Sequence, residues 1–321
     1  MGTPKRRSRM HRTRTGRRIL LTSRDVEIFR QLSRYQFLRS NFLYAFAGGD
    51  SETRFKERLG NLYHEGFIDR PARQWELANC RYVPTIYELG TGGRRALQEQ
   101  GVADIQPITF LAQGAQRQFS HAAMICDILA SVELAARGSV VRFIPWPEIL
   151  AKAPETTRKS ERPYEIPFTS GRSVPQGGPM SAIVPDGLFG LQYSQTNPVS
   201  YRFFALEADR ATMPVTRSDP SQSSILRKIA AYHDIMRAGL HKQRWKIPNL
   251  VVLTVTTNAQ NLAKMISATS LALGARSAFL FSLSEAHGWP PKTIKPNPGF
   301  LQEPWEREGL SSLCIAEASS I

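Results

Sequence analysis

The sequence has few cysteines and no long hydrophobic run. Its three cysteines, Cys80, Cys126 and Cys314, are scattered and form no Cys-x-x-Cys pair, so neither a zinc ribbon nor a disulfide framework is expected. No stretch reaches the roughly 18 uncharged apolar residues of a membrane helix, and no signal-peptide apolar core precedes Ser23. These absences favour a cytoplasmic, reducing location and no membrane partner.

Acidic residues are missing from the first 18 positions. Eight basic residues lie there: Lys5, Arg6, Arg7, Arg9, Arg12, Arg14, Arg17 and Arg18. The whole chain has 42 Lys and Arg against 27 Asp and Glu, so about half of its net charge of +15 belongs to this segment. Residues 1–21 are therefore expected to form a disordered basic arm that neutralises a polyanion such as nucleic acid. A solubilising tail is the alternative.

Residues 22–106 have the pattern of a small DNA-binding domain. One helix is expected from Thr22, where Asp25 completes a capping box, and a second after Ser40. A third follows Ser51, with its apolar residues at i, i+4, i+7 and i+8: Phe55, Leu59, Leu62 and Tyr63. Two β-prone runs, 67–70 and 81–89, predict a hairpin. This order predicts a winged helix-turn-helix in which the third helix reads DNA.

The polar residues of this domain are the candidate contacts with duplex DNA. They are Arg54, Lys56, Arg58 and Asn61 on the third helix and Arg70, Arg73 and Arg81 around the expected wing. Arginine and asparagine pair with guanine and adenine edges, and arginine and lysine bind phosphates. A solvated helix face is the alternative, which Glu57 and Glu65 favour because acids repel phosphate. The run Gly90–Gly93 lacks the ending of a phosphate-binding loop and is expected to cap a helix.

Residues 107–284 predict an α/β domain. A helix is expected at 116–137, strands at 140–144, 183–193, 201–209 and 250–255, and a helix from Asp219-Pro220 to Gly239. Residues 151–180 have the composition of an irregular insertion and 285–321 that of a proline-rich tail. The order of helix, three strands, helix and strand matches the restriction-endonuclease-like core, a mixed sheet flanked by helices. The expected fold class is therefore α+β.

Carboxylates in this domain are the candidates for chemistry. Asp186 opens one strand, and Glu207 and Asp209 lie two apart near the end of the next, so they share a face. Such a cluster binds Mg²⁺, which could activate water for phosphodiester cleavage. Pro185, Asp186 and Glu207 resemble the PD-(D/E)xK signature, but Asp209 stands where its lysine is expected. Lys228 on the next helix is the candidate substitute, and structural ion pairs are the alternative.

Several segments together resemble the replication-relaxation family, whose members are associated with plasmid and integrative-element replication and mobilisation. They include residues 21–25, 59–62, 66–70 and 87–89, His121, Pro185-Asp186-Gly187, residues 204–212, Lys228 and Tyr232. The resemblance spans about residues 20–260. It implies a DNA-binding accessory role near an origin of replication or transfer.

Three functions follow as hypotheses. The first is a DNA-binding accessory protein whose second domain recruits replication or relaxosome proteins or forms a homodimer. The second is a Mg²⁺-dependent nuclease or nickase that uses Asp186, Glu207, Asp209 and Lys228, with Asp186 and Glu207 as the metal ligands. The third is a transcriptional regulator that senses a ligand in the second domain. The sequence shows no gathered apolar pocket to support it.

Overall fold

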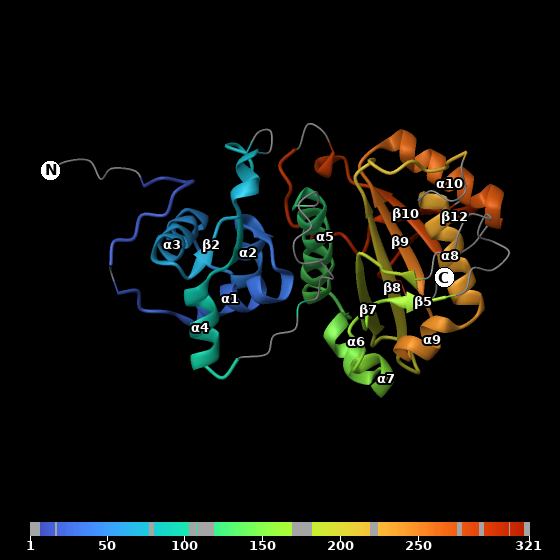
Figure 1. The fold of residues 1–321 in the computed structure, drawn as a ribbon, viewed down its shortest axis with the longest axis horizontal. Helices are drawn as coiled ribbons and strands as arrows, with labels where there is room; N and C mark the ends of the chain where they lie inside the picture. The colour runs from blue at the N-terminus through green and yellow to red at the C-terminus, as the bar shows by residue number, and fades with distance from the viewer. Residues whose placement is uncertain are drawn as a thin grey trace. The chain divides into compact units, whose positions relative to one another are not determined.

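The structure is a computed structural model. It describes residues 7–16, 18–76, 80–102, 107, 119–168, 182–218, 224–274, 278–288, 292–307 and 309–317. The chain divides into two compact units (Figure 1). Unit 1 contains residues 1–109 and 114–130 with Thr293–Pro296, and unit 2 contains residues 110–113 and 131–292 with 297–321.

Unit 1 contains the expected three helices and the helix expected after the glycine run, which begins at Thr91 with Gly90 as its N-cap. They are α1 (Ser23–Tyr35), α2 (Ser40–Ala47), α3 (Glu52–Glu65) and α4 (Thr91–Glu99). The capping box of Thr22 and Asp25 begins α1 as predicted. Ser51 caps α3, and Gly66 ends it in the left-handed conformation that glycine adopts at low cost. Local signals therefore set these helix boundaries.

A small antiparallel sheet accompanies these helices. Its strand order is β1-β3-β2, with β1 at Leu38–Arg39, β2 at Ile68–Asp69 and β3 at Ile86–Leu89. The predicted pairing of the two β-prone runs is present, but β3 is shorter than the run 81–89. Between β2 and β3 lies a 3₁₀ helix, η1 (Ala72–Glu76). The core is formed by buried apolar side chains of helices and strands, among them Phe29, Leu32, Phe42, Leu59, Leu62 and Ile68.

Unit 2 is built on a seven-stranded mixed sheet with the order β12-β11-β10-β9-β8-β7-β4. The strands are β4 (Val141–Pro145), β7 (Gly187–Tyr193), β8 (Ser200–Asp209), β9 (Val251–Thr256), β10 (Phe279–Leu283), β11 (Pro304–Arg307) and β12 (Leu310–Cys314). The pairs among β8, β9 and β10 are parallel, and all others are antiparallel. Unit 2 is thus an α+β fold with a large mixed sheet.

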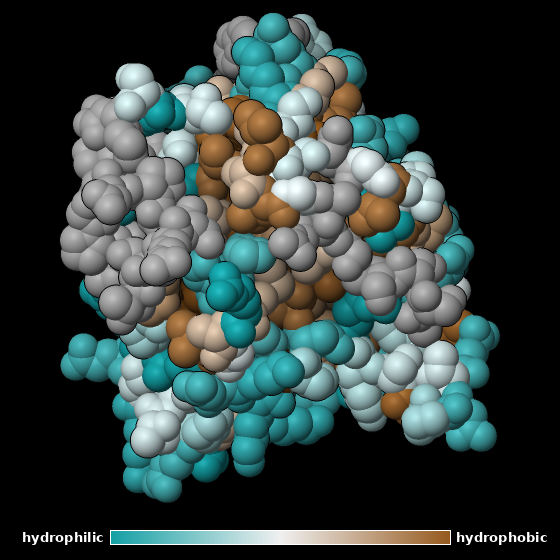
Figure 2. Space-filling model, turned by 90° about the vertical axis from the view of Figure 1, so that its right-hand side faces the viewer, coloured by the Kyte–Doolittle hydropathy of each residue, from teal (hydrophilic) through white to brown (hydrophobic). Residues whose placement is uncertain are grey.

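Helices of unit 2 contribute to an apolar core with the sheet. They include α6 (Trp146–Lys152), α8 (Ile225–Arg237), α9 (Leu240–Trp245) and α10 (Ala259–Leu273), and their core residues include Trp146, Tyr232, Trp245 and Met265. Figure 1 shows α8 and α10 side by side along the sheet. On the surface seen in Figure 2, apolar side chains form patches between hydrophilic ones.

Two segments expected to be irregular contain regular structure. Residues 285–321 include β11 and β12, which extend the sheet, because Pro304 stands first in its strand and costs no central ladder bond. Residues 151–168 include α7 (Glu155–Arg158) and β5 (Ile166–Pro167), which pairs with β6 (Ala182–Ile183). Residues 169–180 of the expected insertion, and the predicted helix start at Asp219-Pro220, lie outside the described residues. Ser224 caps the described α8.

The helix α5 (Phe119–Arg137) is the one described helix long and apolar enough to cross a membrane. Of its apolar 18-residue stretch, 78% is buried within the structure, as in the core helix of a folded domain. Its buried Asp127 forms an ion pair with Arg39, at 2.9 Å from the guanidinium Nε to the carboxylate. Length and composition alone are therefore weak evidence for a membrane span here.

Candidate functional site

The outer face of α3 carries the exposed cations predicted from the sequence. Phe55, Leu59 and Leu62 are buried, and Arg54 and Lys56 are exposed. Lys56 lies 2.8 Å from Glu52 one turn earlier, in a pair that is more than half exposed and therefore weak. Both cations are accessible to a partner.

Arg58 has a different position from its predicted one. Its guanidinium donates to both carboxylate oxygens of Asp25, at 2.9 and 2.6 Å, and to the carbonyl of Leu20 at 2.7 Å. Asp25 is buried and also accepts from the backbone of Thr22. Burial raises the pKa of Asp25, but the hydrogen bonds from Arg58 and Thr22 lower it by more, so the pKa lies below its ordinary value. Arg58 thus links α3 to the start of α1.

Arg70 is also held within unit 1. It donates to the carbonyl of Arg9 at 2.8 Å and to the Tyr87 hydroxyl at 3.1 Å. Its guanidinium lies 4.1 Å from the Tyr63 ring centroid. Of the other residues predicted around the wing, Arg73 is half-buried and Arg81 is exposed. Tyr82, which we did not single out from sequence, is 84% exposed beside Arg81.

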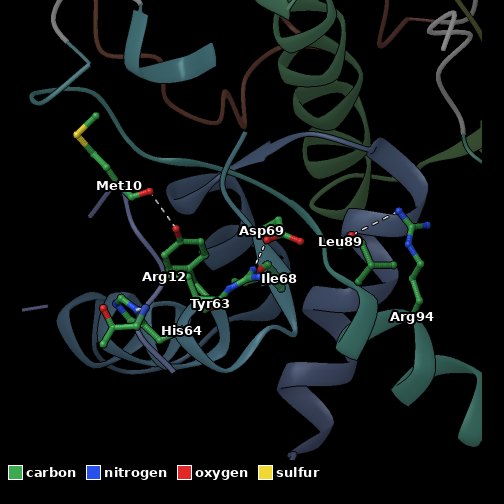
Figure 3. Close-up of polar contacts among 9 residues, drawn as sticks. Met10, Arg12, Tyr63, His64, Ile68, Asp69, Leu89 and Arg94 are labelled. Carbon is green, nitrogen blue, oxygen red and sulfur yellow. Dashed lines mark hydrogen bonds and ion pairs between the residues drawn. The ribbon is translucent and has the colours of Figure 1, made fainter. Parts of the chain in front are cut away.

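The basic arm contacts the C-terminal half of α3. The guanidinium of Arg7 donates to the carboxamide oxygen of Asn61. Arg12 donates to the Tyr63 carbonyl at 2.8 Å, to the Ile68 carbonyl at 3.2 Å and to the Asp69 carboxylate (Figure 3). Residues 7–16, expected to be disordered, therefore have a defined position on unit 1.

Further contacts of the arm come from its backbone. The amide of Thr13 donates to Nδ1 of the buried His64 at 3.1 Å, and Thr15 donates to Glu65 through its amide at 3.0 Å and its hydroxyl at 2.6 Å. The Tyr63 hydroxyl donates to the Met10 carbonyl at 3.2 Å. The bonds from Thr15 lower the pKa of Glu65. Burial and the nearby cations of Arg7, Arg70 and Arg12 lower the pKa of His64, so its Nδ1 accepts.

Arg9 connects the arm to the strand side of unit 1. It donates to the Thr85 hydroxyl at 2.6 Å and to the carbonyls of Arg81 and Val83 at 2.9 and 3.0 Å. Its guanidinium lies 5.4 Å from the Trp75 ring centroid. Composition alone gave no sign of this docking, because a run of arginines with threonine and glycine has no apolar periodicity.

In unit 2, three of the four predicted catalytic residues come together. Glu207 on β8 accepts from the Lys228 ammonium and the Tyr232 hydroxyl, both on α8. Asp186, just before β7, accepts from the Ala208 amide at 2.8 Å and interacts electrostatically with Glu207. The fourth residue, Asp209, accepts instead from the Thr256 hydroxyl on β9 at 2.8 Å.

The protonation of this cluster follows from its burial. Burial, together with the nearby Asp186 carboxylate, raises the pKa of Glu207 to about 7, against the opposing effects of Lys228 and Tyr232. Burial lowers the pKa of Lys228, but Glu207 and Asp186 together raise it above its ordinary value. Near neutral pH the cluster therefore holds an ammonium between two carboxyl groups.

These residues as arranged do not fit a divalent metal. Both carboxylate oxygens of Glu207 already accept from Lys228 and Tyr232, so the ammonium stands where a cation would bind. Within the described parts of the chain, no three acidic, histidine or cysteine side chains are grouped as a metal site requires. The geometry instead gives Lys228 the charge-balancing role.

Comparisons with known proteins bear on the family. The replication-relaxation family model matches residues 29–250, more than half of the chain. Comparison with curated proteins and with solved structures gives no match. The matched region begins within α1 and ends just before β9, so it includes α3 and the cluster around Glu207. The chain therefore belongs to the replication-relaxation family.

Proposed function

We propose that this protein is a cytoplasmic DNA-binding accessory factor in the replication or mobilisation of a plasmid or integrative element. Unit 1 would be its winged helix-turn-helix, with α3 as the recognition helix and the β2–β3 connection as the wing. The observation that carries the proposal is the exposure of Arg54 and Lys56 on α3, beside the exposed Glu52 and Glu57, in a member of this family.

The order of elements in unit 1 supports this assignment. Helix, strand, two helices and two strands follow one another from α1 to β3, and β2 and β3 are antiparallel neighbours. In winged helices of this order the third helix enters the major groove and the wing contacts the flanking backbone. Arg81 and Tyr82 are exposed on the β2–β3 connection, where a cation and an aromatic ring suit that contact.

The middle of α3 supports close approach by a partner. Gly60 lies there with nothing within 4 Å of the position that a Cβ would occupy. A glycine inside a helix costs about 1 kcal/mol relative to alanine, and no internal packing requires it here. A surface without a side chain at this point lets a nucleic-acid backbone or base edge approach the helix.

The test is binding of duplex DNA by the full chain at several salt concentrations. We expect Arg54→Gln to weaken binding to the element's own DNA about tenfold, as loss of one good arginine contact does. Arg158→Gln removes the same charge from an exposed position on α7 and is the matched control. Salt-independent binding, or equal effects of the two substitutions, would exclude α3 as the reading element.

Unit 2 is proposed to recruit replication or relaxosome proteins or to dimerise. Its strand order from β4 through β9, with the α8 crossover before β9, favours a restriction-endonuclease-like arrangement. This strand order alone favours DNA cleavage as the second candidate function, because Asp186, Glu207 and Lys228 as arranged do not fit a divalent metal. Supercoiled plasmid incubated with Mg²⁺ or Mn²⁺ tests it: nicking that Glu207→Ala abolishes would support cleavage, and intact plasmid would exclude it.

A further inference from the structure

The docked arm and the C-terminal half of α3 have the properties of one binding surface. We propose that arm residues 7–16 stay docked on α3 when the protein binds a duplex, and that together they form a cationic surface for the phosphate backbone. This inference rests on the proposed function and adds to it a second, structured contact region. The arm would act as a built part of the interface and not as a free tail.

The acids at this end of α3 contact the docked arm. Glu65 and Asp69 would repel phosphate if they were bare. In the structure Glu65 accepts two hydrogen bonds from Thr15, and Asp69 is paired with Arg12. Thr15 is uncharged, so Glu65 keeps its charge, but docking pairs Asp69 with Arg12 and brings Arg7 to Asn61 and Arg14 beside Gly66. Docking therefore adds positive charge to this end of α3, which an undocked arm would not do.

The arm is held on unit 1 largely through hydrogen bonds from its arginines. Arg9 donates to two carbonyls and a hydroxyl, which are neutral acceptors. Arg7 and Arg14 are exposed on the same segment. Docking thus fixes the position of the arm and leaves Arg7 and Arg14 exposed to phosphates, whose contacts set register on a duplex.

The length of α3 also favours a contact between its C-terminal end and the phosphate backbone. The 14 residues of α3 span about 20 Å, whereas the major groove is roughly 12 Å wide. A helix that reads bases with its N-terminal half, where Arg54 lies, brings its other end near the phosphate backbone. The arm lies at that other end, on Asn61, His64 and Glu65.

The test uses substitutions that undock the arm without changing its charge. Arg12→Lys keeps the charge but loses the guanidinium that reaches Tyr63, Ile68 and Asp69. Thr13→Pro keeps every charge but removes the amide that donates to His64. The matched control is Arg95→Lys, a charge-conserving change at an exposed position on α4. Faster tryptic cleavage within the arm reports undocking, and the thermal unfolding midpoint shows that unit 1 remains folded.

We expect each docking variant to bind duplex about tenfold more weakly than the parent, with a salt dependence shallower by about two phosphate contacts. Unchanged affinity with an undocked arm would overturn the proposal in favour of a free tail. Tighter binding would overturn it in favour of an arm that blocks Asn61. If the parent protein itself fails to bind duplex, the proposed function fails, whereas normal parent binding with unaffected variants overturns only this inference.

Discussion

Arg54 and Arg58 lie four residues apart on α3 and have different roles. Arg54 is exposed, whereas Arg58 forms two bonds to the buried Asp25 and one to the Leu20 carbonyl. Residue type and spacing could not distinguish them, because both occupy the polar side of the same helix. The difference arises from the position of α1, which places a carboxylate beside only one of them.

We therefore expect substitution of Arg58, but not of Arg54, to lower the stability of the fold. Arg58→Gln should lower the free energy of unfolding by about 2 kcal/mol at pH 7, since it leaves a buried carboxylate short of a charged partner. The pKa of Asp25 is lowered in the folded protein, so its stabilising contribution exists above the unfolded value and is lost as the pH falls through the folded one. Urea unfolding should therefore show a smaller deficit at pH 3. Arg54→Gln should leave stability unchanged, and an equal loss would contradict the assignment.

Two glycines of unit 1 give a second contrast. A Cβ at Gly93 would lie 2.5 Å from the Phe67 carbonyl and 2.6 Å from Leu89, whereas one at Gly60 meets nothing. We expect Gly93→Ala to cost roughly 2 kcal/mol through overpacking and Gly60→Ala to add about 1 kcal/mol of stability. Thermal melts measure both. A loss of stability at Gly60 would indicate a structural role and remove its support for partner approach.

At the scale of elements, α8 and β8 are joined by the cluster of Glu207, Lys228 and Tyr232. The sequence predicted that Lys228 could reach the carboxylates, because it flanks the face of α8 that packs on the sheet. It did not predict that Asp209, two residues from Glu207, would pair with Thr256 on the neighbouring strand. That contact depends on β9 lying beside β8 in parallel register, which strand patterns do not specify.

The raised pKa of Glu207 makes the role of Lys228 testable through pH. With Lys228→Met, Glu207 must be either charged without its counter-ion or protonated. Its folded pKa, already about 7, is above the unfolded value, so stability falls as the pH rises through the folded value. We expect a loss of roughly 3 kcal/mol at pH 8 and a smaller loss at pH 5.5. In the Glu207→Gln background this pH dependence should vanish, and its persistence would argue against the pair.

At the scale of the whole molecule, the C-terminal region belongs to the sheet of unit 2. Trp305, Leu313 and Ile315 are buried, and the Tyr193 hydroxyl on β7 donates to the Ile315 carbonyl at 2.7 Å. The prolines of this region predicted an irregular tail. The structure differs because the edge of β10 offers unpaired backbone groups, which β11 satisfies by antiparallel pairing.

Removal of residues 297–321 should therefore expose the β10 edge and its apolar surroundings. We expect lower soluble yield and stronger binding of a hydrophobic dye than for the full chain. Trp305→Ala is the milder variant and should cost about 3–5 kcal/mol in denaturant unfolding. A truncated chain that unfolds at the same temperature as the full one would show that these strands are not part of the cooperative unit.

The sequence by itself determined the helices of unit 1, their caps and buried faces, the pairing of two β-prone runs and the membership suggested by its motifs. These depend on neighbours within a few residues, where apolar periodicity and capping act directly. Only the tertiary structure decided which cations are exposed, where the arm lies and which carboxylates meet. Those outcomes depend on groups distant in sequence, such as Asp25 with Arg58 or Arg12 with Asp69, and no local pattern encodes such distances.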